Sequence, residues 1–179
     1  MEKLSKQTIN IIRTTQRNNI DLTQLADNKA NVLLSLNAIM VTFLLPMILS
    51  NLEVIIQGYL IIPLIILAIT CFSTIYISAI VLKPSNLQEY RASPSEDPDA
   101  QFSPFFFGNF YKMEPDEFFE YMNEVISNTK LVKIHLTQDM YYIGRRLGYK
   151  MDRIRLAFTI FLSGLFLTLL SAGIVIYFL

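Results

Sequence analysis

Three long apolar runs without a charged residue constrain this chain more than any other feature. They occupy residues 32–52, 57–82 and 156–179. Each reaches the length of about 20 residues that an α-helix needs to cross the hydrocarbon core of a bilayer. Soluble proteins rarely contain core helices that are so long and so uniformly apolar. We therefore expect an all-α membrane protein with about three transmembrane helices.

The basic residues predict which ends of these helices face the cytoplasm. All 15 Lys and Arg residues lie before residue 32 or within residues 83–155. The turn near Glu53 and the C-terminus have none. Basic residues next to transmembrane helices favour the cytoplasmic side. The N-terminus and the central segment are therefore expected in the cytoplasm, and the C-terminus outside.

The two polar segments are expected to contribute helices to a cytoplasmic bundle. Residues 1–31 contain no Pro or Gly, and their apolar residues indicate an amphipathic helix that continues into the first span. Residues 83–113 contain several prolines and predict a loop. Residues 114–155 begin with Glu-Pro-Asp-Glu, and a proline followed by acidic residues is typical of a helix start. We expect one long helix there, or two with a bend near Gly144 or Gly148, packed against the N-terminal helix.

Composition and motifs exclude several classes of function. The net charge of zero argues against a nucleic-acid-binding protein. Cys71 and His135 are the only residues of their types, so a disulfide within the chain, a Cys/His metal site and a catalytic pair are not expected. The sequence has no P-loop, Rossmann or kinase motif. We expect no enzyme, no metal and no cofactor, and an ordinary helical role for His135.

A polar stripe follows the helix into the first span. At about 100° per residue, its members fall within about 80° of one another; they are Asp27, Asn31, Ser35, Ala38 and Thr42. Polar residues in a span avoid lipid and face protein or water. The stripe is therefore a candidate for gating or for lining a conduction path. The alternative is helix packing, with Asp27 paired to a base on the long C-terminal helix.

The other two spans carry small and polar residues on one side each. These favour close packing within or between subunits, with a conduction path as the alternative. They are Pro63, Thr70, Thr74 and Ser78 in the second span and Gly164, Thr168 and Ser171 in the third.

Aromatic and basic residues suggest a ligand site in the cytoplasmic part. Aromatic rings such as Phe107 and Tyr111 can stack on a base. Guanidinium and ammonium groups such as Arg145, Arg146 and Lys29 can hold a phosphate. Alternatively, the aromatic residues anchor a loop, and the basic residues set the topology and contact lipid headgroups.

Three strings of this sequence resemble the bacterial Pycsar transmembrane effector family: LADNKANVLLSLNA (25–38), FFGNFYKM (106–113) and QDMYYIGRRLGYKMDRIRLAF (138–158). The resemblance implies a protein of the bacterial inner membrane that acts in antiphage defence. It further implies that a partner cyclase makes cyclic CMP or cyclic UMP after infection. The effector then impairs the inner membrane, and the cell stops growing or dies.

Two functions remain open on the sequence. The first is a membrane effector that responds to a cyclic pyrimidine nucleotide. Because three spans are few for a pore within one chain, this effector is expected to be a homo-oligomer. The second is a non-conducting membrane adaptor that recruits a soluble partner through its cytoplasmic helices.

Overall fold

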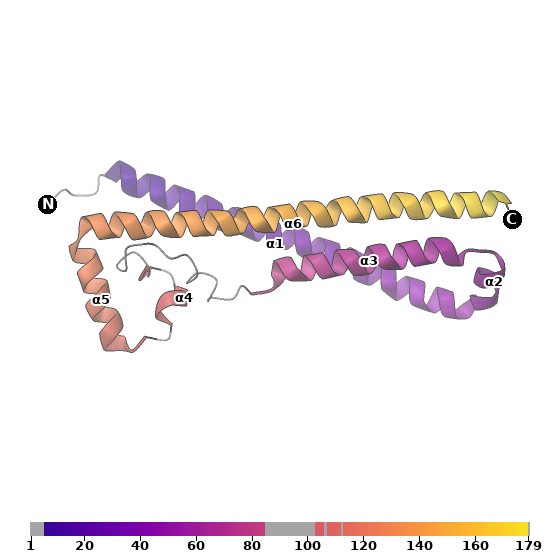
Figure 1. The fold of residues 1–179 in the computed structure, drawn as a ribbon, viewed down its shortest axis with the longest axis horizontal. Coiled ribbons are helices and arrows are strands. Elements are labelled where there is room, and N and C mark those ends of the chain that lie inside the picture. The colour runs from indigo at the N-terminus through magenta and orange to yellow at the C-terminus, as the bar shows by residue number, and fades with distance from the viewer. Residues whose placement is uncertain (1–5, 85–102, 106, 112, 179) are drawn as a thin grey trace, which may run out of the picture. The chain divides into compact units, whose positions relative to one another are not determined.

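Helices make up most of the part of the chain that is described. The computed structural model describes residues 6–84, 103–105, 107–111 and 113–178. No strand occurs among these residues. The helices, shown in Figure 1, are α1 (Lys6–Ser50), α2 (Leu52–Gln57), α3 (Ile61–Leu82), α4 (Phe107–Phe110), α5 (Pro115–Ser127) and α6 (Thr129–Phe178).

The chain divides into two compact units. The polar unit comprises residues 1–23 and 84–148, and the apolar unit comprises residues 24–83 and 149–179. Both α1 and α6 begin in the polar unit and continue without a break into the apolar unit. The polar unit combines the start of α1 with α5 and the start of α6, which agrees with the bundle expected from the sequence.

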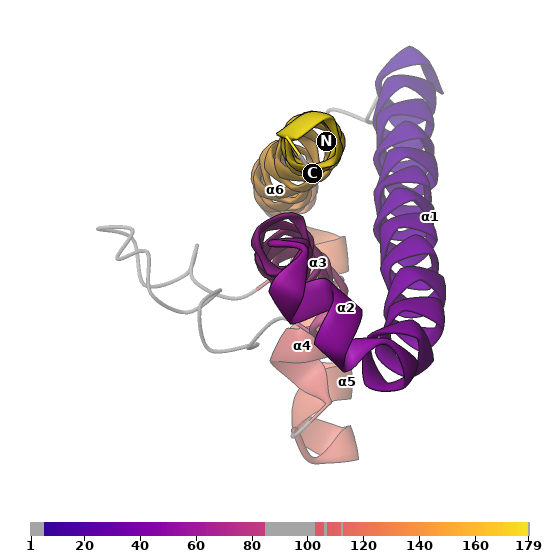
Figure 2. The ribbon, with the colours of Figure 1, turned by 90° about the vertical axis from the view of Figure 1, so that its right-hand side faces the viewer.

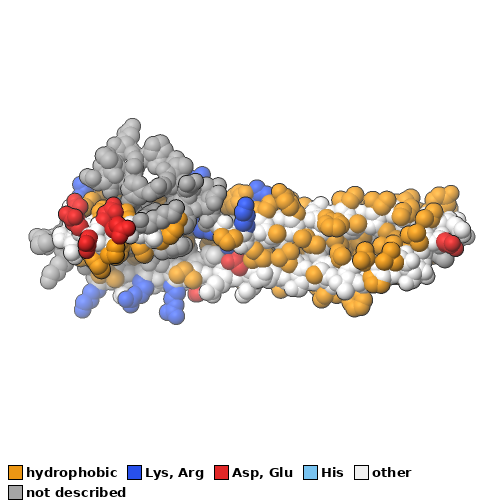
Figure 3. Space-filling view, turned by 90° about the horizontal axis from the view of Figure 1, so that it is seen from below, with side chains coloured by type: hydrophobic (Ala, Val, Ile, Leu, Met, Phe, Trp, Pro, Cys, Tyr) orange, Lys and Arg blue, Asp and Glu red, His pale blue; other side chains and the backbone are white. Residues whose placement is uncertain are grey.

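Three helices, α1, α3 and α6, are long and apolar enough to cross a membrane. This confirms the prediction of an all-α protein with three spans. Hydrophobic side chains cover the apolar unit (Figure 3), in which Glu53 is the only charged residue between positions 30 and 82. Such a surface requires lipid around it, because exposed apolar patches of this extent are unusual in soluble proteins.

The core of the apolar unit lies where α1, α3 and α6 run side by side (Figures 1 and 2). One buried cluster joins Ala26 and Ala30 of α1 to Val81 and Ile154. The next cluster joins Leu33 of α1 to residues further along α6 and further back along α3; these are Ala157, Phe161 and Ile77. Thus α6 runs parallel to α1, and α3 runs antiparallel to both. Small residues in the first cluster allow the close helix approach that is common in membranes.

The helices differ in two places from those expected from the sequence. A short helix, α2, occupies the turn expected near Glu53 and has this residue in its first turn. The bend expected near Gly144 or Gly148 is wrong, since α6 is continuous through both residues. The break lies instead at Asn128, between α5 and α6.

Asn128 ends one helix and starts the next. Its Oδ1 accepts hydrogen bonds from the backbone N–H groups of Lys130 at 3.0 Å and Leu131 at 3.4 Å. These are the N-cap contacts that satisfy otherwise unpaired N–H groups at a helix start. The loop expected at residues 83–113 contains α4, and its residues 85–102 lie outside the described residues.

Candidate functional site

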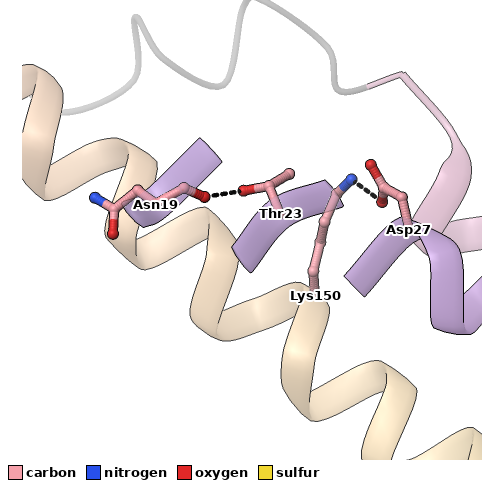
Figure 4. A network of polar contacts seen from close by, with 4 residues as sticks. All are labelled: Asn19, Thr23, Asp27 and Lys150. Carbon is pink, nitrogen blue, oxygen red and sulfur yellow. Dashed lines mark hydrogen bonds and ion pairs between the residues drawn. The ribbon is translucent and has the colours of Figure 1, made fainter. Parts of the chain in front are cut away.

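An ion pair joins α1 and α6 within the apolar unit. Lys150 Nζ donates to Asp27 Oδ1 at 2.5 Å (Figure 4). The side chains are 12 % exposed for Lys150 and 34 % exposed for Asp27. Pairing offsets the desolvation cost that both charges incur there. The helix-packing interpretation of the stripe predicts that Asp27 pairs with a base on the long C-terminal helix, and this contact agrees with it.

The other members of the polar stripe point away from the packed interior. Asn31, Ser35 and Thr42 are all exposed, as is Ala38. The buried face of α1 is made by other residues, namely Ala26, Ala30, Leu33 and Asn37. At about 100° per residue, the centre of the stripe lies roughly 140° around the helix from this buried face. The four exposed residues of the stripe therefore take no part in packing within the chain.

A third face of α1 is exposed and apolar. Its residues lie between the stripe and the buried face; they are Val32, Leu36, Ile39 and Phe43. As far as Thr42, the helix therefore shows lipid-compatible and polar side chains on separate exposed faces; beyond Thr42, the exposed Leu45 and Leu49 lie at the angle of the stripe. A helix surrounded by lipid on every exposed side would have no physical reason for this separation, because polar groups in hydrocarbon are costly.

Pro46 adds a polar group to the stripe. It lies inside α1 and has no N–H to donate to the Thr42 carbonyl four residues earlier. The Thr42 Oγ1 does not meet this need, since it donates to the Ala38 carbonyl at 2.8 Å. At membrane depth, a carbonyl freed in this way is satisfied by a neighbouring helix, a polar side chain or water.

The polar side of α3 is buried, whereas the polar stripe of α1 is exposed beyond Asp27. Pro63, Thr70, Thr74 and Ser78 are all buried within the protomer. Thr70 and Thr74 donate to the carbonyls of Ile66 at 2.8 Å and Thr70 at 2.7 Å. A Cβ at Gly164 of α6 would collide with the Thr70 side chain. For this side of α3, the packing interpretation is the one that the structure supports.

The five candidate ligand-binding residues are divided between the two units. Lys29 is exposed on α1 in the apolar unit. Phe107, in α4, belongs to the polar unit, as do Tyr111 just after it and both arginines of α6. Tyr111 and Arg145 are exposed, and Arg146 is half-buried. The Phe107 side chain lies outside what the structure describes.

The structure also shows a buried polar cluster that the sequence interpretation missed. His135 is 1 % exposed and Asp139, one helical turn later, is 7 % exposed. Ser103 Oγ donates to Asp139 Oδ2 at 2.8 Å, and the Tyr121 ring lies edge-on to the His135 ring with centroids 6.5 Å apart. The expectation that His135 is an ordinary helix residue does not describe this environment.

Both ring nitrogens of His135 lack a hydrogen-bond partner among the described residues. Burial lowers the pKa of His135, and the nearby Gln138 side chain opposes this shift without reaching hydrogen-bond geometry. Burial raises the pKa of Asp139, an effect that the Ser103 hydroxyl partly offsets. A buried, unpaired polar group costs about 1–3 kcal/mol, so this arrangement calls for a physical explanation.

Among the described residues, no group of three or more His, Cys, Asp or Glu side chains is placed to hold a metal ion. The protein-family model described as PycTM, Pycsar effector protein domain, matches residues 10–177 of the chain. No curated protein and no solved structure matches the chain significantly.

Proposed function

Since the chain belongs to the PycTM family of Pycsar effector proteins, which are membrane effectors of antiphage defence, we propose that it responds to cyclic CMP or cyclic UMP by impairing the bacterial inner membrane. The nucleotide comes from a partner cyclase after infection, and growth arrest or cell death follows. The polar unit lies in the cytoplasm in this proposal, and the C-terminus lies outside.

The exposed polar face of α1 is the observation that carries the membrane-impairing step. Asn31, Ser35 and Thr42 lie on a helix apolar enough to cross a membrane, yet they do not pack within the protomer. A homo-oligomer that brings these faces together removes them from lipid. It also surrounds a polar path along residues 31–42 of α1, which a single chain with three spans does not supply.

The continuity of two helices supports a link between ligand and path. Both α1 and α6 run from the polar unit into the apolar unit. A nucleotide that binds one packing of the polar unit more tightly shifts the population toward that packing. Shifting a balance from 1:99 to 99:1 needs about 5.5 kcal/mol of differential affinity, which several identical sites in an oligomer supply together. Of the five candidate ligand contacts, the polar unit contains Phe107, Tyr111, Arg145 and Arg146, whereas Lys29 belongs to the apolar unit.

Ion flux from liposomes that contain the purified chain tests this function. We expect cyclic CMP or cyclic UMP to release the trapped ions and the corresponding purine nucleotides to release none. Asn31→Leu should insert and assemble normally but abolish flux and toxicity, because it removes a polar group from the path. The matched control is Val32→Leu, on the neighbouring apolar face, which should conduct as the wild type does.

Two results would contradict the proposal in different ways. Flux from Asn31→Leu equal to that of the wild type would remove the polar stripe from the path. A wild-type protein that binds the nucleotide without any flux would favour the adaptor, whose partner would have to bind the polar unit. Phe119, Ile126 and Tyr141 are exposed there and would be the first residues to examine.

A further inference from the structure

The buried His135 has hydrogen-bonding capacity that the described residues do not use. A neutral imidazole has one N–H donor and one nitrogen acceptor. Neither is satisfied by a residue that the structure describes, although the side chain is 1 % exposed. Leucine or phenylalanine would fill such a position without an unmet polar requirement. A ligand that carries both an acceptor and a donor on a planar edge would satisfy it.

The surroundings of His135 extend this polar edge. Asp139 lies one turn further along α6, and its carboxylate accepts the Ser103 hydroxyl at 2.8 Å. Its raised pKa brings Asp139 closer to the neutral acid, which can donate as well as accept. The Tyr121 ring of α5 closes the side of the cluster next to His135. These groups resemble the few convergent polar contacts by which proteins orient a heterocycle in an otherwise apolar site.

One of the two neighbouring arginines lies on the same face of α6. Arg146 follows Asp139 by seven residues, which is about 20° short of two full turns. Arg145 lies about 120° around the helix from Asp139. The rise from Asp139 to Arg146 is about 10.5 Å, comparable to the length of a mononucleotide. Arg146 is half-buried, whereas Arg145 is exposed.

We propose that a mononucleotide binds along this face of α6 in the polar unit, with its base at His135 and Asp139 and its phosphate at Arg146. The inference rests on the proposed function for the kind of ligand, and it adds which residues bind which part. The Ser103 hydroxyl donates to one carboxylate oxygen of Asp139, so the base competes with Ser103 for that carboxylate.

Isothermal titration calorimetry on the detergent-purified full chain, with cyclic CMP and cyclic UMP as probes, tests the site. Arg146→Ala should weaken binding by about tenfold or more, because a charged hydrogen bond is lost. Lys133→Ala, which removes an exposed base about 120° around α6 from Asp139, should bind within about threefold of the wild type. Equal losses in the two variants would overturn the assignment of the phosphate.

His135→Leu separates a ligand contact from a purely structural residue. This substitution replaces two ring nitrogens that have no hydrogen-bond partner among the described residues by an apolar side chain of similar size. Without nucleotide, the variant should therefore melt at the same temperature as the wild type or at a higher one. Binding should nevertheless weaken by about tenfold or more. If His135→Leu melts as expected and binds as tightly as the wild type, the assignment of the base is wrong. If it does not fold, the comparison of Arg146→Ala with Lys133→Ala decides the outcome.

The wild type distinguishes the failure of this inference from failure of the proposed function. A wild-type chain that binds neither nucleotide contradicts the proposed function, and the site falls with it. A wild-type chain that binds one of them, while Arg146→Ala and His135→Leu bind equally well, contradicts only the site. In that case the exposed candidates Tyr111 and Arg145 would be the next to test.

Discussion

Asp27 contributes to helix packing, whereas the other residues of the polar stripe do not. It begins the polar stripe, but its carboxylate turns to Lys150 of α6, whose side chain is the more buried of the pair. Thr23, one turn earlier, donates instead to the Asn19 carbonyl within α1 (Figure 4). The ion pair therefore joins two helices beside the cluster of Ala26, Ala30 and Ile154.

Lys150→Met should destabilise the chain, because it leaves the Asp27 carboxylate half-buried and unpaired. The expected loss is about 1–3 kcal/mol, measured by thermal or denaturant unfolding in detergent. The charge exchange Asp27→Lys with Lys150→Asp should recover part of this loss, since it restores a pair of opposite sign. A control, Arg155→Met, removes an exposed base nearby and should change stability little. If both single variants behave alike, the ion pair does not hold the helices together.

The sequence predicted the partner of Asp27 better than the environment of His135. A carboxylate at the start of a transmembrane helix needs a basic partner. Only a few basic residues of the long C-terminal helix lie close to the third span, so the choice of partners was small. The burial of His135 depends on tertiary structure. Ser103, which binds Asp139, lies 36 residues before it, and no periodic pattern connects the two. The spacing of His135 and Asp139 by one turn was the only available signal, and it is common on helices.

At the scale of elements, hydrophobicity and length predicted the spans, because the bilayer thickness sets both. The break at Asn128 was missed, since apolar residues such as Val125 and Val132 continue the helical spacing across it. Gly144 and Gly148 were the more obvious breakers, but glycine within a helix costs only about 1 kcal/mol. The N-cap signal of Asn128 was therefore the better evidence.

Gly164 is the element-scale position where a single methyl group should matter most. A Cβ there would collide with Thr70, so Gly164→Ala should force α3 and α6 apart and cost about 1–3 kcal/mol. Gly173→Ala, on the same helix, meets nothing within 4 Å and should be neutral or slightly stabilising. Unfolding of both variants in detergent measures the difference. Thr70→Ala combined with Gly164→Ala should recover only part of the stability, because the Cβ of residue 70 itself lies 2.7 Å from the added Cβ. An unimpaired Gly164→Ala would show that the helices do not approach so closely.

At the scale of the whole molecule, the three spans differ in how much of their length is buried within the chain. In the most apolar stretch of α3, 39 % of the residues are buried, against 11 % in α1 and 11 % in α6. The central helix is therefore α3, and the outer helices keep most of their surface for other contacts. On α1 this surface is divided between an apolar face and a polar stripe. In the proposed oligomer, lipid contacts the apolar face and a second copy of the chain contacts the polar stripe.

Cysteine cross-linking tests whether the polar stripes of separate copies meet. In a Cys71→Ala background, which removes the buried native thiol, Ser35→Cys should form a covalent dimer with a short bis-maleimide in membranes. Ile39→Cys, on the exposed apolar face of the same helix, should cross-link much less because it faces lipid. A closed symmetric ring brings the same residue of each copy around one axis, so the difference should persist at low protein density. Equal cross-linking at both positions, or none at Ser35→Cys, would mean that the stripe does not lie between copies, and the conduction path would have to be sought along another face.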